Sequence, residues 1–265
     1  MKLNHSKIKS FAIVVAVVVM TAIVGCTKRS SIDFDVYTVE HVVENDSVRF
    51  NLEVSVDFPK PNCTGEAVDS IRLFLVRTMF GMNQLEEPNA LLQRYRDTVF
   101  ANYCAEMREF RRVAGFTDAF VEEVVGNANV LNDTLLSYDH AVYLYYGGSQ
   151  GQRRFNSYVF NLSTGARLTE SDLFRDEEMT SLSALLTQTL TELVEKTVDS
   201  VMPNGNFAVE EEGIRYRYDS YELNTFEIPA VESIDLMLPT EKVLPIMRTN
   251  SIVYHYLSTV TTAKE

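Results

Sequence analysis

The residues Gly147-Gly148-Ser149-Gln150-Gly151 satisfy the G-x-S-x-G pattern of a nucleophile elbow. In that motif a strand precedes the serine and a helix follows it directly, so that the serine oxygen is exposed for attack on a carbonyl. A strand is expected before this motif, but residues 153–162 have the pattern of another strand. The sequence therefore favours a glycine-rich hairpin turn. A serine hydrolase acting through Ser149, with His255 as its base, is the alternative.

The sequence offers few other candidates for catalytic or metal-binding residues. Two acidic clusters are expected at helix beginnings, where they favour the helix dipole: Asp118 with Glu122 and Glu123, and Asp176 with Glu177 and Glu178. Asp133 and Asp139 lie at and near the start of a predicted strand and could bind a cation, but they lack the spacing of a calcium loop. His41, His140 and His255 have no His or Cys at metal-binding spacing. We expect no metal and no cofactor, and an enzyme is the less favoured class.

An apolar run that ends in Gly25-Cys26 predicts export. Three lysines precede an uncharged stretch over 11–22, and a signal peptide has its segments in this order. The stretch is also too short to span a membrane. A cysteine at the cleavage point is typical of a bacterial lipobox, so Cys26 is expected to carry the lipid anchor. Thr27 favours the outer membrane, and 28–31 lack the acidic cluster of Bacteroidetes-like surface export, so we expect a periplasm-facing protein. An ordinary signal peptide or an uncleaved anchor is the alternative.

The charge of the mature chain bears on its partners. Residues 1–25 hold three lysines and no acids, which leaves 21 basic and 37 acidic residues, a net charge of −16. Nucleic acid is disfavoured because its phosphates would be repelled. A cationic partner fits this charge, although a solvated acidic surface explains it as well. An apolar share of 46% predicts a globular domain, and the absence of Trp weakens a sugar-stacking interpretation.

Two cysteines, Cys63 and Cys104, remain once Cys26 is acylated. Residues 66–81 and 88–114 have helical periodicity and a short connection between them. In an antiparallel hairpin centred near Leu85, Cys63 would lie opposite a position within about one turn of Cys104. We therefore predict a Cys63–Cys104 disulfide, as is common in exported proteins, with two unpaired thiols as the alternative.

The apolar periodicity predicts an α+β fold, because strands and helices come in mixed blocks. We expect two packed α/β subdomains with mixed or antiparallel sheets, a helical hairpin and one long amphipathic helix over 176–201. Strands are predicted at 35–43, 48–58, 134–146, 155–162, 213–218 and 233–238. The expected organisation is a signal peptide at 1–25, a lipid tether at 26–33, an N-terminal strand-helix-helix subdomain at 34–132, a C-terminal domain at 133–248 and a tail at 249–265.

Tyrosines cluster on or near the glycine turn: Tyr143, Tyr145, Tyr146 and Tyr158. Core packing in strands explains them in one interpretation. In the other they form a binding surface, because tyrosine combines a large contact area with a polar group. The candidate binding residues are Tyr145, Tyr146, Gly147, Gly148, Gln150 and Arg153.

The order of motifs from residue 140 to 247 resembles a known family. The matching segments are the glycine turn at 145–151, the Thr-Gly turn at 160–168, the Asp-Leu-Phe motif at 171–174, the aromatic strand at 213–222 and the final strand and Pro-initiated helix at 228–244. This order resembles the extracytoplasmic domain shared by the anti-sigma factor RsiV and the peptidoglycan deacetylase PdaC. In one departure from the family pattern, Gln150 replaces the histidine of the glycine turn.

The resemblance implies a non-enzymatic binding or sensing module of the cell envelope, because the anti-sigma factor uses this domain to bind lysozyme. The expected partners are the membrane, through Cys26, and a cationic protein such as lysozyme or a cell-wall glycan. Gln150 in place of histidine implies a different ligand or an altered affinity.

Overall fold

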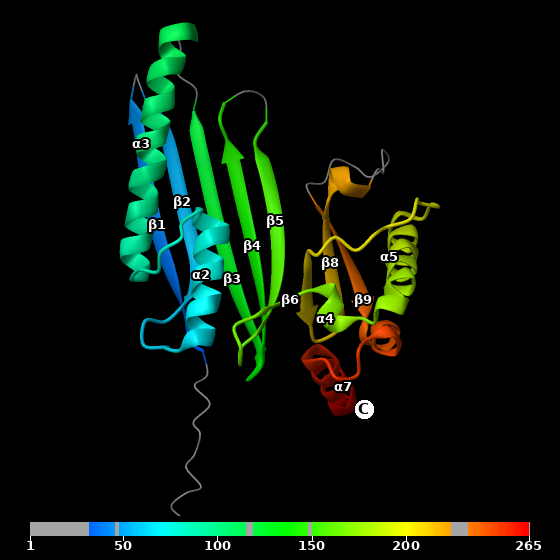
Figure 1. Ribbon diagram of the computed structural model, residues 1–265. Coiled ribbons are helices and arrows are strands. Elements are labelled where there is room, and N and C mark those ends of the chain that lie inside the picture. The colour runs from blue at the N-terminus through cyan, green and yellow to red at the C-terminus, as the bar shows by residue number, and fades with distance from the viewer. Residues whose placement is uncertain (1–31, 46–47, 115–118, 148–149, 224–232, 265) are drawn as a thin grey trace, which may run out of the picture. The chain divides into compact units, whose positions relative to one another are not determined.

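The computed structural model describes residues 32–45, 48–114, 119–147, 150–223 and 233–264 (Figure 1). Residues Ile32–Glu265 form one compact unit. The predicted signal peptide and Cys26 lie outside the described residues, as do Gly148 and Ser149. Among the described helices, none has the length and apolar character needed to cross a membrane.

The larger sheet is mixed. Its strands follow the order β1 (Phe34–Asn45), β2 (Val48–Pro59), β3 (Phe120–Asn132), β4 (Leu135–Tyr145), β5 (Gln152–Asn161) and β6 (Arg167–Leu168). All neighbours are antiparallel except β2 and β3, which are parallel. A parallel pair needs a long crossover, and α2 (Glu66–Phe80) and α3 (Pro88–Ala114) provide it.

The smaller sheet is antiparallel, with β8 (Gly213–Asp219) between β7 (Phe207–Glu210) and β9 (Ser233–Pro239). The helices of this part are α4 (Glu170–Leu173), α5 (Met179–Val194), α6 (Thr240–Val243) and α7 (Ile252–Lys264), with short 3₁₀ turns at Asp176–Glu178, Ser220–Leu223 and Leu244–Ile246. The fold class is α+β, as predicted from the mixed blocks of elements.

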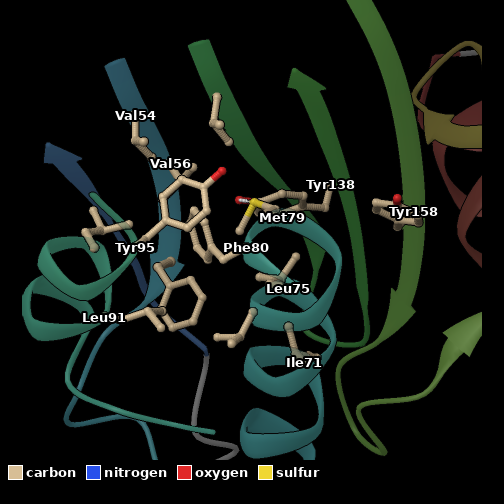
Figure 2. Packing of buried hydrophobic residues seen from close by; sticks show 14 of the residues in the cluster. Val54, Val56, Ile71, Leu75, Met79, Phe80, Leu91, Tyr95, Tyr138 and Tyr158 are labelled. Carbon is tan, nitrogen blue, oxygen red and sulfur yellow. Dashed lines mark hydrogen bonds between the residues drawn. The ribbon is translucent and has the colours of Figure 1, made fainter. Parts of the chain in front are cut away.

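The first core lies between the larger sheet and its two helices. The unbroken alternation of β2 buries every second side chain to 2% exposure or less: Phe50, Leu52, Val54, Val56 and Phe58. Figure 2 shows side chains of α2 and α3 pointing toward these strands, with Leu75, Met79 and Phe80 from α2 and Leu91 and Tyr95 from α3.

The second core joins the smaller sheet to α5, α6 and α7. It also includes Leu135 and Val159 from the opposite face of β4 and β5, so the larger sheet contributes to both cores. The predicted boundary between residues 132 and 133 falls inside the β3–β4 hairpin. The segment predicted as a tail forms α7, which buries Val253 and Leu257 completely.

The two helices of the crossover do not form the predicted antiparallel hairpin. Arg72 of α2 donates a hydrogen bond to the carbonyl of Pro59, at the end of β2. Further along, Tyr103 of α3 accepts a hydrogen bond from the backbone of Arg49, near the start of β2. These contacts place α2 near the end of β2 and the later part of α3 near its start, and Figure 1 shows both helices running in the same direction along the sheet, opposite to β2.

The predicted disulfide is not formed, and both cysteines are free. The direction of the helices explains the error. The Cys63 sulfur lies 3.7 Å from the carbonyl oxygen of Asp33, at the end of the sheet where β1 begins. Cys104 follows Tyr103, whose hydroxyl is bound near the opposite end of β2.

Two further predictions of elements were wrong. Glu122 and Glu123 were expected at the beginning of a helix but lie in β3. A charged residue at a buried position of this strand hid its alternating pattern, because Glu122 is only 7% exposed. The long helix expected over 176–201 ends at Val194, because Glu195 adopts a left-handed conformation with φ 55°.

His140 of β4 gives the fold a predictable response to pH. His140 is 4% exposed, and neither ring nitrogen has a hydrogen-bond partner among the described residues. Burial lowers the pKa of His140 to about 4. The unfolded chain therefore binds a proton below about pH 6.5 that the folded chain binds only near pH 4.

We expect the free energy of unfolding to fall as the pH drops from about 6.5 to 4, by on the order of 3 kcal/mol from this group. Urea unfolding at a series of pH values measures it. The His140→Leu variant should lose most of this slope between pH 6.5 and 4, whereas His255→Gln, at an exposed position, should keep it. Equal slopes in the wild type and His140→Leu would contradict the assignment.

Candidate functional site

The candidate site is built on the turn between β4 and β5. The last residue pairs of this antiparallel hairpin are Tyr143 with Arg153 and Leu144 with Gln152. Gly147 has φ 84°, a conformation that favours glycine. Gly151 packs so closely against the Tyr143 ring that a Cβ atom would overlap it. The glycines therefore serve a hairpin turn, as the sequence predicts.

The same geometry weakens the hydrolase alternative. A nucleophile elbow requires a helix directly after the serine, and the residues after this turn form β5. The proposed base, His255, lies on α7, which packs in the second core. Ser149 itself is outside the described residues.

Tyr145 and Tyr146 do not form one patch. Successive residues of a strand point to opposite faces, and Tyr146 directly follows the last residue of β4. The Tyr146 ring lies 5.1 Å from the Phe120 ring, on the face that carries α2 and α3. Tyr145 pairs with Val121 and lies on the other face, together with Tyr143 and Arg153. The alternation of side chains along a strand would have predicted that Tyr145 and Tyr146 lie on opposite faces.

On the helix face, Tyr146 ends a row of aromatic rings. The Phe50 and Phe120 rings are stacked at 5.1 Å with an interplanar angle of 4°, and Tyr103 and Phe100 of α3 pack against Phe50. The four inner rings are buried or half-buried, whereas Tyr146 is 57% exposed. A large aromatic side chain is thus held by a rigid core and remains open to solvent.

A buried carboxylate lies beside this row. The Tyr95 hydroxyl donates a 2.6 Å hydrogen bond to Glu122, which is 7% exposed. Burial raises the pKa of Glu122, and the hydrogen bond offsets only part of that increase. Burial also raises the pKa of Tyr146, and the carboxylates of Glu122 and Glu106 raise it further. The surroundings of the exposed ring are therefore acidic.

On the other face, Arg153 is already engaged by the protein. Its guanidinium lies 5.1 Å from the centre of the Tyr143 ring and 3.4 Å from the Glu123 carboxylate. These contacts tie β5 to β4 and β3. Arg153 and Tyr146 thus lie on opposite faces of the sheet. Glu123, which was predicted at the beginning of a helix, lies beside Arg153.

Arg215 of β8 is a polar centre that the sequence did not reveal. Its guanidinium donates two hydrogen bonds, of 2.8 and 3.0 Å, to Asp139 of β4 and one more to Glu210 of β7. Asp139, considered above as a cation ligand, is thus bound to an arginine. Within the described part of the chain, no group of His, Cys, Asp or Glu residues could hold a metal ion.

Arg215 is only 8% exposed, and its contacts link the smaller sheet to the larger one. Burial lowers the pKa of the guanidinium, but Asp139 and Glu210 outweigh burial and raise it overall. The arginine therefore stays charged while it joins the sheets.

We expect Arg215→Met to lower the free energy of unfolding by on the order of 2 kcal/mol. This is less than the cost of breaking a fully buried pair, because Asp139 and Glu210 retain contact with water. Arg96→Met, which removes a surface ion pair with Asp97, should cost less than about 1 kcal/mol. Urea titration at pH 7 compares the two. Equal losses would show that Arg215 does not join the sheets energetically.

Comparison with known proteins supports the fold. No family model matches the sequence, and no curated protein matches it. A member of the DUF3298 family from Bacteroides fragilis has a similar structure, with a TM-score of 0.73 and 18% identity over 86% of this chain and 98% of that chain. A DUF3298 family protein from Pseudomonas aeruginosa PAO1 has a TM-score of 0.56 and 14% identity over 83% of this chain and 95% of that chain.

At these identities the likeness concerns the fold alone. The RsiV/PdaC-like domain is itself a DUF3298 family, so the structural neighbours are consistent with the resemblance in the motif order.

Proposed function

We propose that this chain is a cell-envelope lipoprotein whose folded part is a non-enzymatic module that binds a cationic protein. The observation that carries the proposal is the exposed ring of Tyr146 at the end of the aromatic row. Tyrosine is enriched at the centres of protein interfaces, where a rigid anchor loses little entropy on binding. Phe120 provides this rigidity.

The charge around Tyr146 supports a cationic partner. Glu122 and Glu106 act on the Tyr146 hydroxyl, and the mature chain has 37 acidic against 21 basic residues. An arginine or lysine of the partner could place its charge over the ring while the acidic residues attract it. Lysozyme, which the family resemblance implies, is a partner of this kind. The excess charge accelerates the encounter, and the ring provides the specific contact.

The test is a titration of residues 32–265 with a c-type lysozyme. We expect Tyr146→Ala to weaken binding by more than about 1 kcal/mol, roughly fivefold or more, without a change in melting temperature. Leu193→Ala is the matched control, because Leu193 is 59% exposed on α5 and belongs to another part of the surface. Affinity should also fall as salt is raised.

The outcomes separate the site from the function. Binding that is equal in Tyr146→Ala and wild type would remove the site assignment. Failure of the wild-type protein to bind lysozyme in low salt would remove the proposed partner.

The lipoprotein part of the proposal rests on Cys26 and the apolar run before it. We expect labelled palmitate to enter the full-length protein in its native bacterium, and Cys26→Ala to abolish the label and release the protein from the membrane fraction. Cys63→Ala should keep both, because that cysteine belongs to the folded part. Label retained in Cys26→Ala would contradict the lipobox assignment.

A further inference from the structure

Strand β1 is a long open edge of the larger sheet. It pairs with β2 at all positions from Phe34 to Asn45 without a register shift. No other strand in the described part of the chain pairs with its outer side. An edge of this kind presents a row of backbone donors and acceptors that can pair with another strand.

The edge lacks several of the features that normally prevent such pairing, although it carries the acidic residues Asp35, Glu40 and Glu44. The sequence FDVYTVEHVVEN contains no lysine, proline or glycine, and its regular register with β2 has no bulge. On the face away from the helices, Val36 is 64% exposed and Val42 is 56% exposed. Two valines of an edge strand are thus left in solvent six positions apart.

We propose that β1 pairs antiparallel with β1 of a second copy of this chain, in the register centred on Val39. In this register Val36 lies opposite Val42 of the second copy, and Val42 lies opposite its Val36. Directly opposed apolar side chains on one face of a sheet stabilise the pairing. Both exposed valines are then covered, and the larger sheets of the two copies become one continuous sheet.

The charges of β1 fit the same register. Glu40 lies opposite Thr38 of the second copy, Asp35 lies opposite its Val43, and Glu44 lies opposite its Phe34. Each acid therefore meets an uncharged residue. A register centred on Glu40 is less favourable. It would place Glu40 opposite Glu40 of the second copy, and Val36 opposite the charged Glu44.

The expected dimer is weak, because one strand pair buries little area and both copies are acidic. We therefore expect a dissociation constant in the micromolar range or above, and trapping by a disulfide is the sharper test. Residues 32–265 contain both cores, so the experiment uses this part with Cys63 and Cys104 changed to serine.

Val36→Cys and Val42→Cys are made in separate chains and mixed under mild oxidation. Opposed residues of an antiparallel pair lie within disulfide distance, so the mixture should yield a covalent dimer. Each variant alone should yield far less, because identical positions lie about 20 Å apart in this register. Equal cross-linking of the single variants and the mixture, or none in any sample, would overturn the register.

A second measurement tests the edge without cysteines. Sedimentation equilibrium of the wild-type fragment over a concentration series should show dimers that disappear in Val36→Lys/Val42→Lys, since edge lysines oppose pairing. Leu193→Lys, at an exposed position of α5, should leave the dimer unchanged. A monomer at all concentrations, or a dimer that survives the lysine substitutions in β1, would contradict the proposal.

Discussion

The guanidinium of Arg215 adds a polar link between the smaller sheet and the larger sheet, which already share the second core. It is buried in the smaller sheet and binds Asp139 of the larger sheet through two hydrogen bonds. Nearby, the Ser137 hydroxyl donates to the carbonyl of Val209 and accepts from its amide, so β4 and β7 are joined at a second point. A buried charge requires such partners, which restricts how the smaller sheet can dock on β4 and β5.

With one face of β4 and β5 engaged by the smaller sheet, the other face is available to the helices. The crossover from β2 to β3 places α2 and α3 on that side of the larger sheet, with α3 over β1 and β2 (Figure 1). The parallel pairing of β2 with β3 brings Phe120 against Phe50. The aromatic row under Tyr146 is therefore a product of the crossover. Its exposed end lies at the β4–β5 turn because that hairpin extends to the level of Phe120.

The surface that results has two features of different kinds. Tyr146 is a single large side chain on a rigid support beside buried and exposed carboxylates. The outer side of β1 is a backbone edge with two exposed valines. The first suits recognition of a cationic side chain and the second suits strand pairing, so partner binding and self-association can occupy different parts of the molecule.

The amino-acid pattern is enough to predict the regular elements: the alternation of β2, the bounds of α2 and α3, and the glycine turn between β4 and β5. These depend on local backbone geometry and on which face of an element is apolar. Contacts between distant parts of the chain set three other features: α3 continues in the direction of α2, Glu122 belongs to a buried strand, and Asp139 is bound to Arg215. Periodicity identifies the buried face of a helix but not its direction after a loop. The partner of a buried charge is likewise set by contacts between residues distant in the chain, such as the pairing of Asp139 with Arg215.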